Sequence, residues 1–309
     1  MTLHEDEIPI DARLVRTLID AQFPQYAQLA LRRLDETGST NALFRLGDEL
    51  LVRLPLQPGN GAAIEAEQRW SDVFRSRMPV AIPRTLAVGR PGSGYPERWS
   101  ILGWLPGERP SAYQPGQVAA PPRSRLAAEL AVVIQAIRSA PLTAGDIRDP
   151  SLRGYRGGTL AEFDRSVRGY LDDCRGNPEL DVDLDLAQQI WEAALRLPGA
   201  DRAAADQWYH GDLVAENLLV SRGGLSAVVD FGVSVGDPTI DLHGAWELFD
   251  PPAREIFRDR LDADEATWLR GRAWALGIAL GTFSYYWRTL PSRCADRLAM
   301  IRNVLADAS

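Results

Sequence analysis

Along the first hundred residues, apolar positions recur at helical spacing in two segments and form short strand-like runs in others. From residue 11 to residue 29 they recur at the spacing of one helix face, which predicts a helix, and Asp11 can cap its first turn. Residues 61–77 predict a second helix. Short apolar runs bounded by polar turn residues predict strands at residues 31–34, 42–46, 50–54, 85–89 and 99–104. The order strands, helix, strands indicates a small antiparallel sheet with one packed helix.

The pattern changes after residue 105. Pro106-Gly107 follows an apolar strand, as a natural hinge would, and prolines continue to residue 122. We therefore expect an α+β fold with a sheet-containing lobe over residues 1–105 and a larger, mostly helical lobe over residues 106–309. Helical periodicity in the second lobe predicts helices at residues 125–139, 160–174, 185–197, 241–248, 252–260, 265–288 and 292–307.

One β-hairpin is expected within the helical lobe. Between residues 218 and 229, two short apolar runs flank a glycine-rich turn, and this pattern predicts two antiparallel strands. A hairpin returns the chain to its starting end. Asn217 and Asp230 should therefore lie side by side, with Asp212 one loop upstream.

The residue types around this hairpin suit phosphoryl transfer. The oxygens of Asn217 and Asp230 are hard ligands of the kind that Mg²⁺ binds together with phosphates and water. The carboxylate of Asp212 is the candidate base that orients an attacking hydroxyl group and takes its proton. The order and spacing of these residues form a stronger signal than any one of them alone.

The same residues carry a family resemblance. His-Gly-Asp-x-x-x-x-Asn at residues 210–217, followed by Asp-Phe-Gly at 230–232, resembles the catalytic segment of aminoglycoside phosphotransferases and related small-molecule kinases. Gly-Asp-Pro-x-x-Asp-Leu at 236–242 is similar to an element of the same superfamily. The resemblance implies a bilobal, protein-kinase-like fold. It also implies that His210 and Asp241 hold the catalytic loop.

Two departures from protein kinases bear on the acceptor. Protein kinases usually carry arginine at the position of Gly211. In addition, no Ala-Pro-Glu sequence follows where their activation segment would end. The resemblance therefore implies a small molecule as the acceptor.

The resemblance also implies that the first lobe binds the nucleotide. Arg53 occupies the position where kinases usually carry a phosphate-binding lysine, and the sequence contains no lysine at all. Arginine can still bind phosphate oxygens, with a fork geometry that differs from an ammonium group. Glu65 and Glu67 could each pair with Arg53 from the helix that follows, and the register against the family favours Glu67.

Two further segments of this lobe are candidate nucleotide contacts. Ser39 and Thr40 lie in a small polar loop that could cover the triphosphate with hydroxyl and backbone amide groups. Ile101 to Trp104 should be the hinge strand whose backbone meets adenine. The indole of Trp104 is expected to serve packing more than base stacking.

Composition narrows the class of protein. A net charge of −8 and a pI of about 5.1 argue against nucleic acid as a partner. The amino terminus lacks the apolar segment of a signal peptide, and the apolar stretch at residues 274–286 is too short to span a bilayer. Cys174 and Cys294 have no metal-binding or redox spacing, which favours a reducing cytoplasm.

These observations predict a phosphotransferase that moves the γ-phosphate of ATP or GTP, with Mg²⁺, to a hydroxyl group of a small molecule. By resemblance, the first-choice acceptor is an aminoglycoside-like antibiotic, and a small metabolite or a macrolide is the alternative. A nucleotide-binding pseudokinase is a further alternative, for which the arginine at position 53 is the support. The sequence leaves the natural acceptor, the choice between ATP and GTP, and the oligomeric state open.

Overall fold

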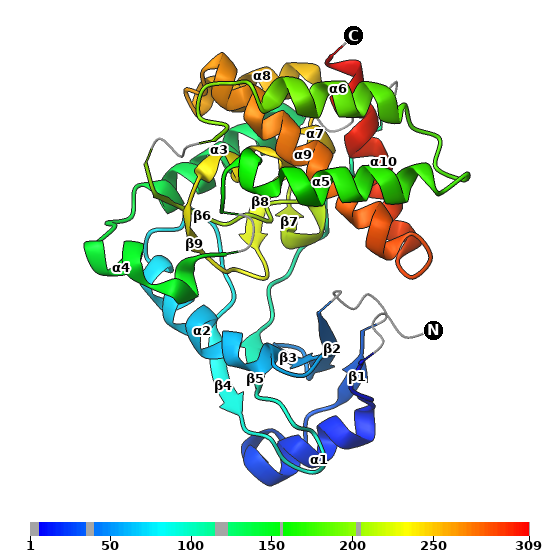
Figure 1. Ribbon diagram of the computed structural model, residues 1–309. Helices are drawn as coiled ribbons and strands as arrows, with labels where there is room; N and C mark the ends of the chain where they lie inside the picture. The colour runs from blue at the N-terminus through cyan, green and yellow to red at the C-terminus, as the bar shows by residue number, and fades with distance from the viewer. Residues whose placement is uncertain (1–5, 35–39, 115–122, 155–156, 202–204, 309) are drawn as a thin grey trace. The chain divides into compact units, whose positions relative to one another are not determined.

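A computed structural model describes residues 6–34, 40–114, 123–154, 157–201 and 205–308 (Figure 1). The chain divides into two compact units. The first comprises Met1–Ser76, Ala81–Pro106 and Val229–Gly232, and the second comprises Arg77–Val80, Gly107–Val228 and Val233–Ser309. The main division falls between Pro106 and Gly107. The short segment around Asp230 belongs to the first unit, although it follows the hairpin in sequence.

The first unit is built on a five-stranded antiparallel sheet. Its strand order is β1 (Leu31–Arg33), β2 (Asn41–Leu46), β3 (Leu50–Pro55), β5 (Trp99–Gly103) and β4 (Thr85–Gly89). All five strands were expected from the sequence, with ends that differ by one residue at most. In β3, Arg53 pairs with Leu43 of β2 on one side and with Ser100 of β5 on the other.

One face of this sheet is covered by α1 (Ala12–Gln22). Asp11 caps it by accepting a 2.7 Å hydrogen bond from the amide of Leu14. Val15, Leu18 and Ile19 are fully buried with the apolar side chains of β2 and β3 in one core cluster. The helix ends at Gln22 rather than at residue 29, because Pro24 begins a separate 3₁₀ turn.

The other α-helix in the described part of this unit is α2 (Ala63–Phe74). Its Phe74 is fully buried and packs against Phe231, with ring centroids 5.9 Å apart. The hydroxyl group of Ser71 on the same helix lies 3.4 Å from the carbonyl oxygen of Phe231. Both helices were therefore expected from the sequence, at residues 11–29 and 61–77, and α2 anchors the Asp-Phe-Gly segment.

The second unit is mostly helical (Figure 1). Its long helix α9 (Glu265–Tyr286) contacts α5, α6, α7 and α10, and it buries Trp274, Leu276 and Leu280. A helix surrounded by other helices needs apolar residues on several faces, as α9 has. The remaining helices are α3 (Arg123–Arg138), α4 (Ala144–Arg148), α5 (Leu160–Arg175), α6 (Leu184–Ala194), α7 (Gly244–Leu248), α8 (Pro251–Arg260) and α10 (Pro291–Ala306).

Two small antiparallel sheets lie in the second unit. The expected hairpin is present as β7 (Leu218–Ser221) and β8 (Gly224–Val228), with Leu218 paired to Val228. Arg222 and Gly223 at its turn both have positive φ, as in the turns that suit the twist of a hairpin. The second sheet pairs β6 (Gln207–Tyr209) with β9 (Ser234–Gly236), and it was not anticipated.

The expected helix at residues 241–248 is not continuous. Pro238–Leu242 forms a 3₁₀ turn, and α7 begins only at Gly244. A side chain at position 244 would meet the carbonyl oxygen of Leu213, so the helix packs closely against the loop after β6.

In the described ranges, no helix combines the length and the apolar character needed to cross a bilayer.

Candidate functional site

The loop after β6 holds His210, Gly211 and Asp212, and a buried carboxylate braces its backbone. Asp241 is fully buried and accepts hydrogen bonds from the amides of Gly211 at 2.7 Å and His210 at 3.1 Å. Burial raises the pKa of Asp241, and Arg138 and the two loop amides offset only part of that rise. The role expected for Asp241, a brace for backbone amides, is confirmed.

Asp212 is held by its neighbours in this loop. The side-chain amide nitrogen of Asn217 donates to Asp212 Oδ2 at 2.8 Å and to the Asp212 carbonyl oxygen at 2.9 Å. The backbone amide of Asp212 donates to Nδ1 of His210 at 3.3 Å. The Asp212 carboxylate therefore has a fixed direction, which is what a base that must meet a hydroxyl group requires.

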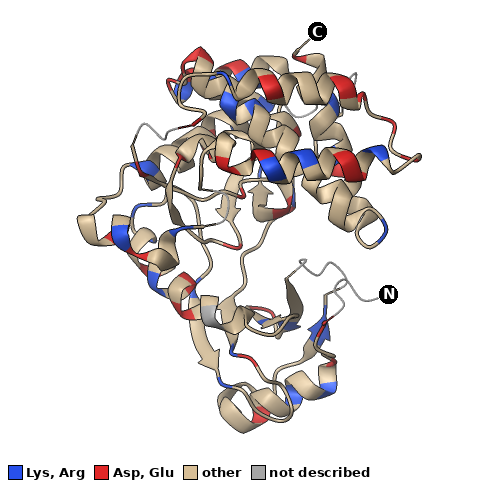
Figure 2. Ribbon diagram, in the orientation of Figure 1, with Lys and Arg blue, Asp and Glu red and all other residues tan. Residues whose placement is uncertain are grey.

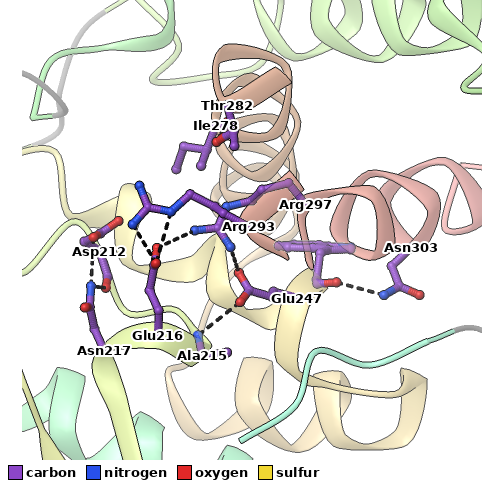
Figure 3. Close-up of polar contacts among 11 residues, drawn as sticks. Asp212, Ala215, Glu216, Asn217, Glu247, Ile278, Thr282, Arg293, Arg297 and Asn303 are labelled. Atoms are coloured by element: carbon purple, nitrogen blue, oxygen red, sulfur yellow. Dashed lines mark hydrogen bonds and ion pairs between the residues drawn. The ribbon is translucent and has the colours of Figure 1, made fainter. Parts of the chain in front are cut away.

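The 3₁₀ turn Ala215–Asn217, which precedes β7, carries a charged group that was not predicted from the sequence. Glu216 forms ion pairs with Arg293, at 2.6 Å, and with Arg297, at 3.0 Å, both from α10 (Figure 3). Arg297 also pairs with Glu247 of α7. No local motif marks these contacts, since Glu216, Glu247 and the two arginines are far apart in sequence and belong to three different elements.

In the first unit, Arg53 forms the centre of a second polar group. Its Nη2 pairs with Glu67 of α2, and its Nη1 lies 3.0 Å from Oδ1 of Asp230. Glu65 pairs with Arg98 instead. The structure thus places Glu67 rather than Glu65 against Arg53.

The electrostatics of this second group follow from its burial. Burial raises the pKa of Glu67, with Arg53 opposing the rise. Burial also lowers the pKa of Arg53, but the carboxylates of Glu67 and Asp230 outweigh it and keep that pKa above its ordinary value. The side chain of Asp230 is 53% exposed, so its carboxylate stays accessible to a ligand.

Asp230 has an unusual backbone conformation. Its φ is +52°, in the left-handed region that residues other than glycine seldom adopt. Phe231, the next residue, is fully buried. The buried ring fixes the segment while the strained residue before it presents its carboxylate to Arg53.

The other expected nucleotide contacts have different positions. Ser39 lies outside the described residues. Thr40 is exposed, its hydroxyl accepts from the side chain of Asn41 at 2.9 Å, and its carbonyl accepts from the amide of Leu56 at 2.8 Å. A contact between the nucleotide and the Thr40 hydroxyl stays a prediction.

Of the two residues expected in the hinge strand, Ile101 lies within β5, and Trp104 lies just past the end of β5. Ile101 is fully buried and pairs with Val52 of β3 and Ala87 of β4, so an adenine contact through its backbone would compete with this pairing. The amide of Trp104 donates to the carbonyl of Glu49, and the Arg45 guanidinium lies 3.6 Å from the Trp104 ring centroid. Trp104 thus stacks on a cation, in agreement with a packing role.

Helix α5 carries four acidic residues, and each of them has a local partner, including Asp172, which lies 3.5 Å from Arg175. Glu162 caps its own helix together with Thr159. Asp164 pairs with Arg168, and Asp173 accepts from the hydroxyl of Ser284. Carboxylates and arginines alternate along this helix (Figure 2). These residues are consistent with ordinary helix capping and surface ion pairs.

Comparison with known proteins yields one family and a group of similar structures. A model of the phosphotransferase enzyme family matches residues 32–274. No curated protein matches the chain. The GDP complex of an aminoglycoside 2′-phosphotransferase IIIa is 16% identical, with a TM-score of 0.70 over 97% of this chain and 100% of that one.

Two other similar structures have related names. The GDP and kanamycin complex of APH(2″)-IIIa is 18% identical, with a TM-score of 0.67 over 95% of this chain and 97% of that one. The macrolide 2′-phosphotransferase MphH from Brachybacterium faecium is 19% identical, with a TM-score of 0.58 over 95% and 98% of the two chains. These likenesses confirm the α+β, protein-kinase-like fold.

Proposed function

Because the chain belongs to the phosphotransferase enzyme family, we propose that it transfers the γ-phosphate of ATP or GTP to a hydroxyl group of a small molecule. The observation that carries this proposal is the contact of Asn217 with Asp212, which fixes the candidate base by two hydrogen bonds. Similar structures include complexes with GDP and with ATP, and these support a nucleotide donor.

Asp212 is the proposed catalytic base. Its carboxylate would accept the proton of the acceptor hydroxyl as the oxygen attacks the γ-phosphorus atom and the bond to the β-phosphate oxygen breaks. The proton passes to Asp212, and the nucleoside diphosphate leaves. The brace from Asp241 to the loop backbone keeps this carboxylate in place during the transfer.

Mg²⁺ is proposed at Asn217 and Asp230. The amide nitrogen of Asn217 faces Asp212, so its oxygen is the atom that a cation would meet. Asp230 contacts Arg53 through one oxygen and is half exposed, so its carboxylate can also accept a cation. Both are hard oxygen donors, which fits a magnesium ion that shares its ligands with phosphates and water. The bound ion supplies neutralisation of charge on the phosphate oxygens.

The first unit is the proposed nucleotide-binding lobe. Arg53 would contact the donor phosphates, and Glu67 would hold the guanidinium group in position. The second unit would bind the acceptor. Both cysteines are buried and unbridged, which supports a reducing, cytoplasmic setting.

An aminoglycoside-like antibiotic is the first candidate acceptor. It is supported by the family resemblance of the catalytic segment and by similar structures that are named as aminoglycoside phosphotransferases, among them a gentamicin complex.

An acceptor with less positive charge, such as a macrolide or a small metabolite, is the second candidate. Glu216, four residues after Asp212, is paired with two arginines, so its carboxylate is already neutralised. A polycationic amino sugar gains little from a carboxylate in this state.

A nucleotide-release assay tests the proposal. Purified protein with Mg²⁺ and ATP or GTP is mixed with aminoglycosides, macrolides and hydroxylated metabolites in turn. One class should stimulate release of the nucleoside diphosphate and gain a phosphoryl group by mass spectrometry, and Asp212→Asn should abolish both. Binding of nucleotide without stimulation by any acceptor would favour the pseudokinase instead.

A further inference from the structure

The last helix of the described chain sends two arginines toward the catalytic loop. The side chain of Arg297 is only 4% exposed, and its Nη2 lies 3.0 Å from Oε1 of Glu216. Its Nη1 pairs with Glu247. Arg293, one helical turn earlier, contacts the other oxygen of Glu216 at 2.6 and 3.1 Å. One guanidinium group therefore joins two carboxylates from different elements.

Both carboxylates lead back to the 3₁₀ turn before β7. Glu247 is fully buried, and its second oxygen accepts from the amide of Ala215 at 3.1 Å. Glu216 is the next residue of the turn, and Asn217, the last, holds the Asp212 carboxylate. Figure 3 shows the contacts from α10 to Glu216 and Ala215 and the separate contact of Asn217 with Asp212, and the backbone of the turn joins the two sets.

We propose that Arg297 is a positioning residue for the phosphoryl transfer. By clamping Glu216 and Glu247, it holds the turn Ala215–Asn217 in the orientation in which Asn217 meets Asp212. This inference rests on the proposed function, because it assigns Arg297 a part in that reaction. Arg297 acts through the turn.

Arginine suits position 297 because its guanidinium group has two terminal nitrogens arranged as a fork. Two nitrogens at fixed separation can serve two carboxylates at once, which a single ammonium group does less well. Burial lowers the pKa of Arg297, but the carboxylates of Glu247, Glu216, Asp212 and Asp296 outweigh burial and hold that pKa above its ordinary value, so the guanidinium remains charged. A buried charge that loses one partner is strongly unfavourable. The turn therefore has a strong preference for one position.

The helix that supplies Arg297 is itself fixed. The side-chain amide of Asn303 on α10 donates to the carbonyl of Trp246 at 2.9 Å and to the carbonyl of Tyr113 at 3.1 Å. Trp246 precedes Glu247 on α7. Because α10 contacts α7 at both Trp246 and Glu247, the clamp is tied to the core of the second unit.

The test compares Arg297 with an arginine that is equally buried. Arg254 on α8 is also 4% exposed, and it pairs with Asp307 at 2.7 Å and donates to the carbonyl of Phe249 at 2.8 Å. Both of these partners lie outside the catalytic loop. Arg297→Met and Arg254→Met thus remove the same group from similar burial, and Arg297→Lys retains the charge without the fork.

Three quantities are measured for each variant: melting temperature, steady-state kinetics and amide hydrogen exchange of residues 211–217. Both methionine variants should lower the melting temperature to a similar degree. Only Arg297→Met should lower kcat, by about tenfold or more, with the nucleotide KM changed by less than about twofold. Arg297→Lys should be intermediate. The Ala215 amide should exchange faster in Arg297→Met and stay unchanged in Arg254→Met.

Equal kcat losses in the two methionine variants, or unchanged exchange at Ala215 in Arg297→Met, would overturn the inference. If the wild-type protein transfers no phosphate but Arg297→Met still loosens the turn, the proposed function fails and the positioning stands. If Arg297→Met does not fold, Glu216→Gln replaces it, because it keeps the Arg297–Glu247 pair. That variant should lower kcat and speed amide exchange within residues 211–217, and its failure to do either would count against the clamp.

Discussion

The fully buried carboxylate of Asp241 accepts a 2.7 Å hydrogen bond from the backbone amide of Gly211. Asp241→Asn should therefore destabilise the protein, because an amide nitrogen would replace one of the two accepting oxygens. We expect the free energy of unfolding to fall by about 1–3 kcal/mol, measured by urea denaturation. Asp237→Asn is the control, because the buried Asp237 accepts from Thr239 with one oxygen, which asparagine retains. Equal losses in the two variants would contradict the bracing role.

Gly211 itself should resist substitution. Its φ is +82°, and an added Cβ would lie 3.1 Å from the ring of Tyr209. Gly211→Ala should lower the free energy of unfolding by about 1 kcal/mol or more and should also lower kcat. Gly223→Ala in the hairpin turn has a similar φ of +75° and open space around the site. It should cost stability through the backbone alone and leave kcat unchanged, so a kcat loss in both would argue against a special role for residue 211.

Glu67 and Glu65 provide a matched pair on α2. Glu67→Gln should weaken nucleotide binding by about tenfold, because Arg53 loses the charge that holds its guanidinium group. Glu65→Gln should change affinity by less than about twofold, since its pair with Arg98 is exposed on both sides, at 62% and 45%. Calorimetric titration with Mg·ATP or Mg·GTP measures both. Equal nucleotide affinities in the two variants would show that Glu67 has no special part in nucleotide binding.

Substitution of Asp212 and substitution of Asp230 should impair different properties of the protein. Asp212→Ala should lower kcat by about 10²–10⁴-fold, as expected for loss of a positioned base, and leave nucleotide affinity nearly unchanged. Asp230→Ala should instead abolish the part of nucleotide affinity that depends on Mg²⁺. Titrations with and without Mg²⁺ distinguish the two. Full turnover by Asp212→Ala would show that the base lies elsewhere.

Glu247 should make stability depend on pH. Burial raises its pKa to about 7, with Glu216 and Asp296 adding to the rise and Arg297 and the amide of Ala215 opposing it. Because the folded pKa exceeds the ordinary value of 4.5, the stability that this group contributes is present below pH 4.5. It is lost as pH rises through 7.

Glu247→Gln should remove that pH dependence. The free energy of unfolding is measured at pH 5 and pH 8 for both proteins. A pKa that moves by one changes stability by about 1.4 kcal/mol, so the wild type should lose at least this much more than the variant between the two pH values. Equal losses would mean that Glu247 is charged throughout this range.

Much of the fold was predictable because its signals are local. The five strands of the first sheet are short apolar runs between polar turns, and the hairpin turn at residues 222–223 favours positive φ. The strands β6 and β9 have three residues each, too few for alternation to show. The helix expected to reach residue 29 was wrong beyond Gln22, where Pro24 outweighs the apolar spacing.

Some residues of the candidate site could also be predicted from the sequence, and others could not. The residues that bear the family motif could be identified, and so could the brace from Asp241. The partners of Glu216 could not be identified, because Arg297 is 81 residues away in sequence. Nothing in the sequence indicates that an arginine on a helix is buried. Charge alone predicts a surface position for such a residue. Only tertiary packing reveals that it is inside.

The guanidinium groups that hold the catalytic turn come from α10, the last helix of the described chain. A shortened copy of the gene that ends before this helix would still encode every motif between residues 210 and 242. It would lack Arg293 and Arg297, and the buried Glu247 would face no counter-charge from them. Such a copy would pass a motif search as intact, and on the proposed role of Arg297 its Asp212 would be misplaced, so motif content would be a poor guide to which truncated copies remain active.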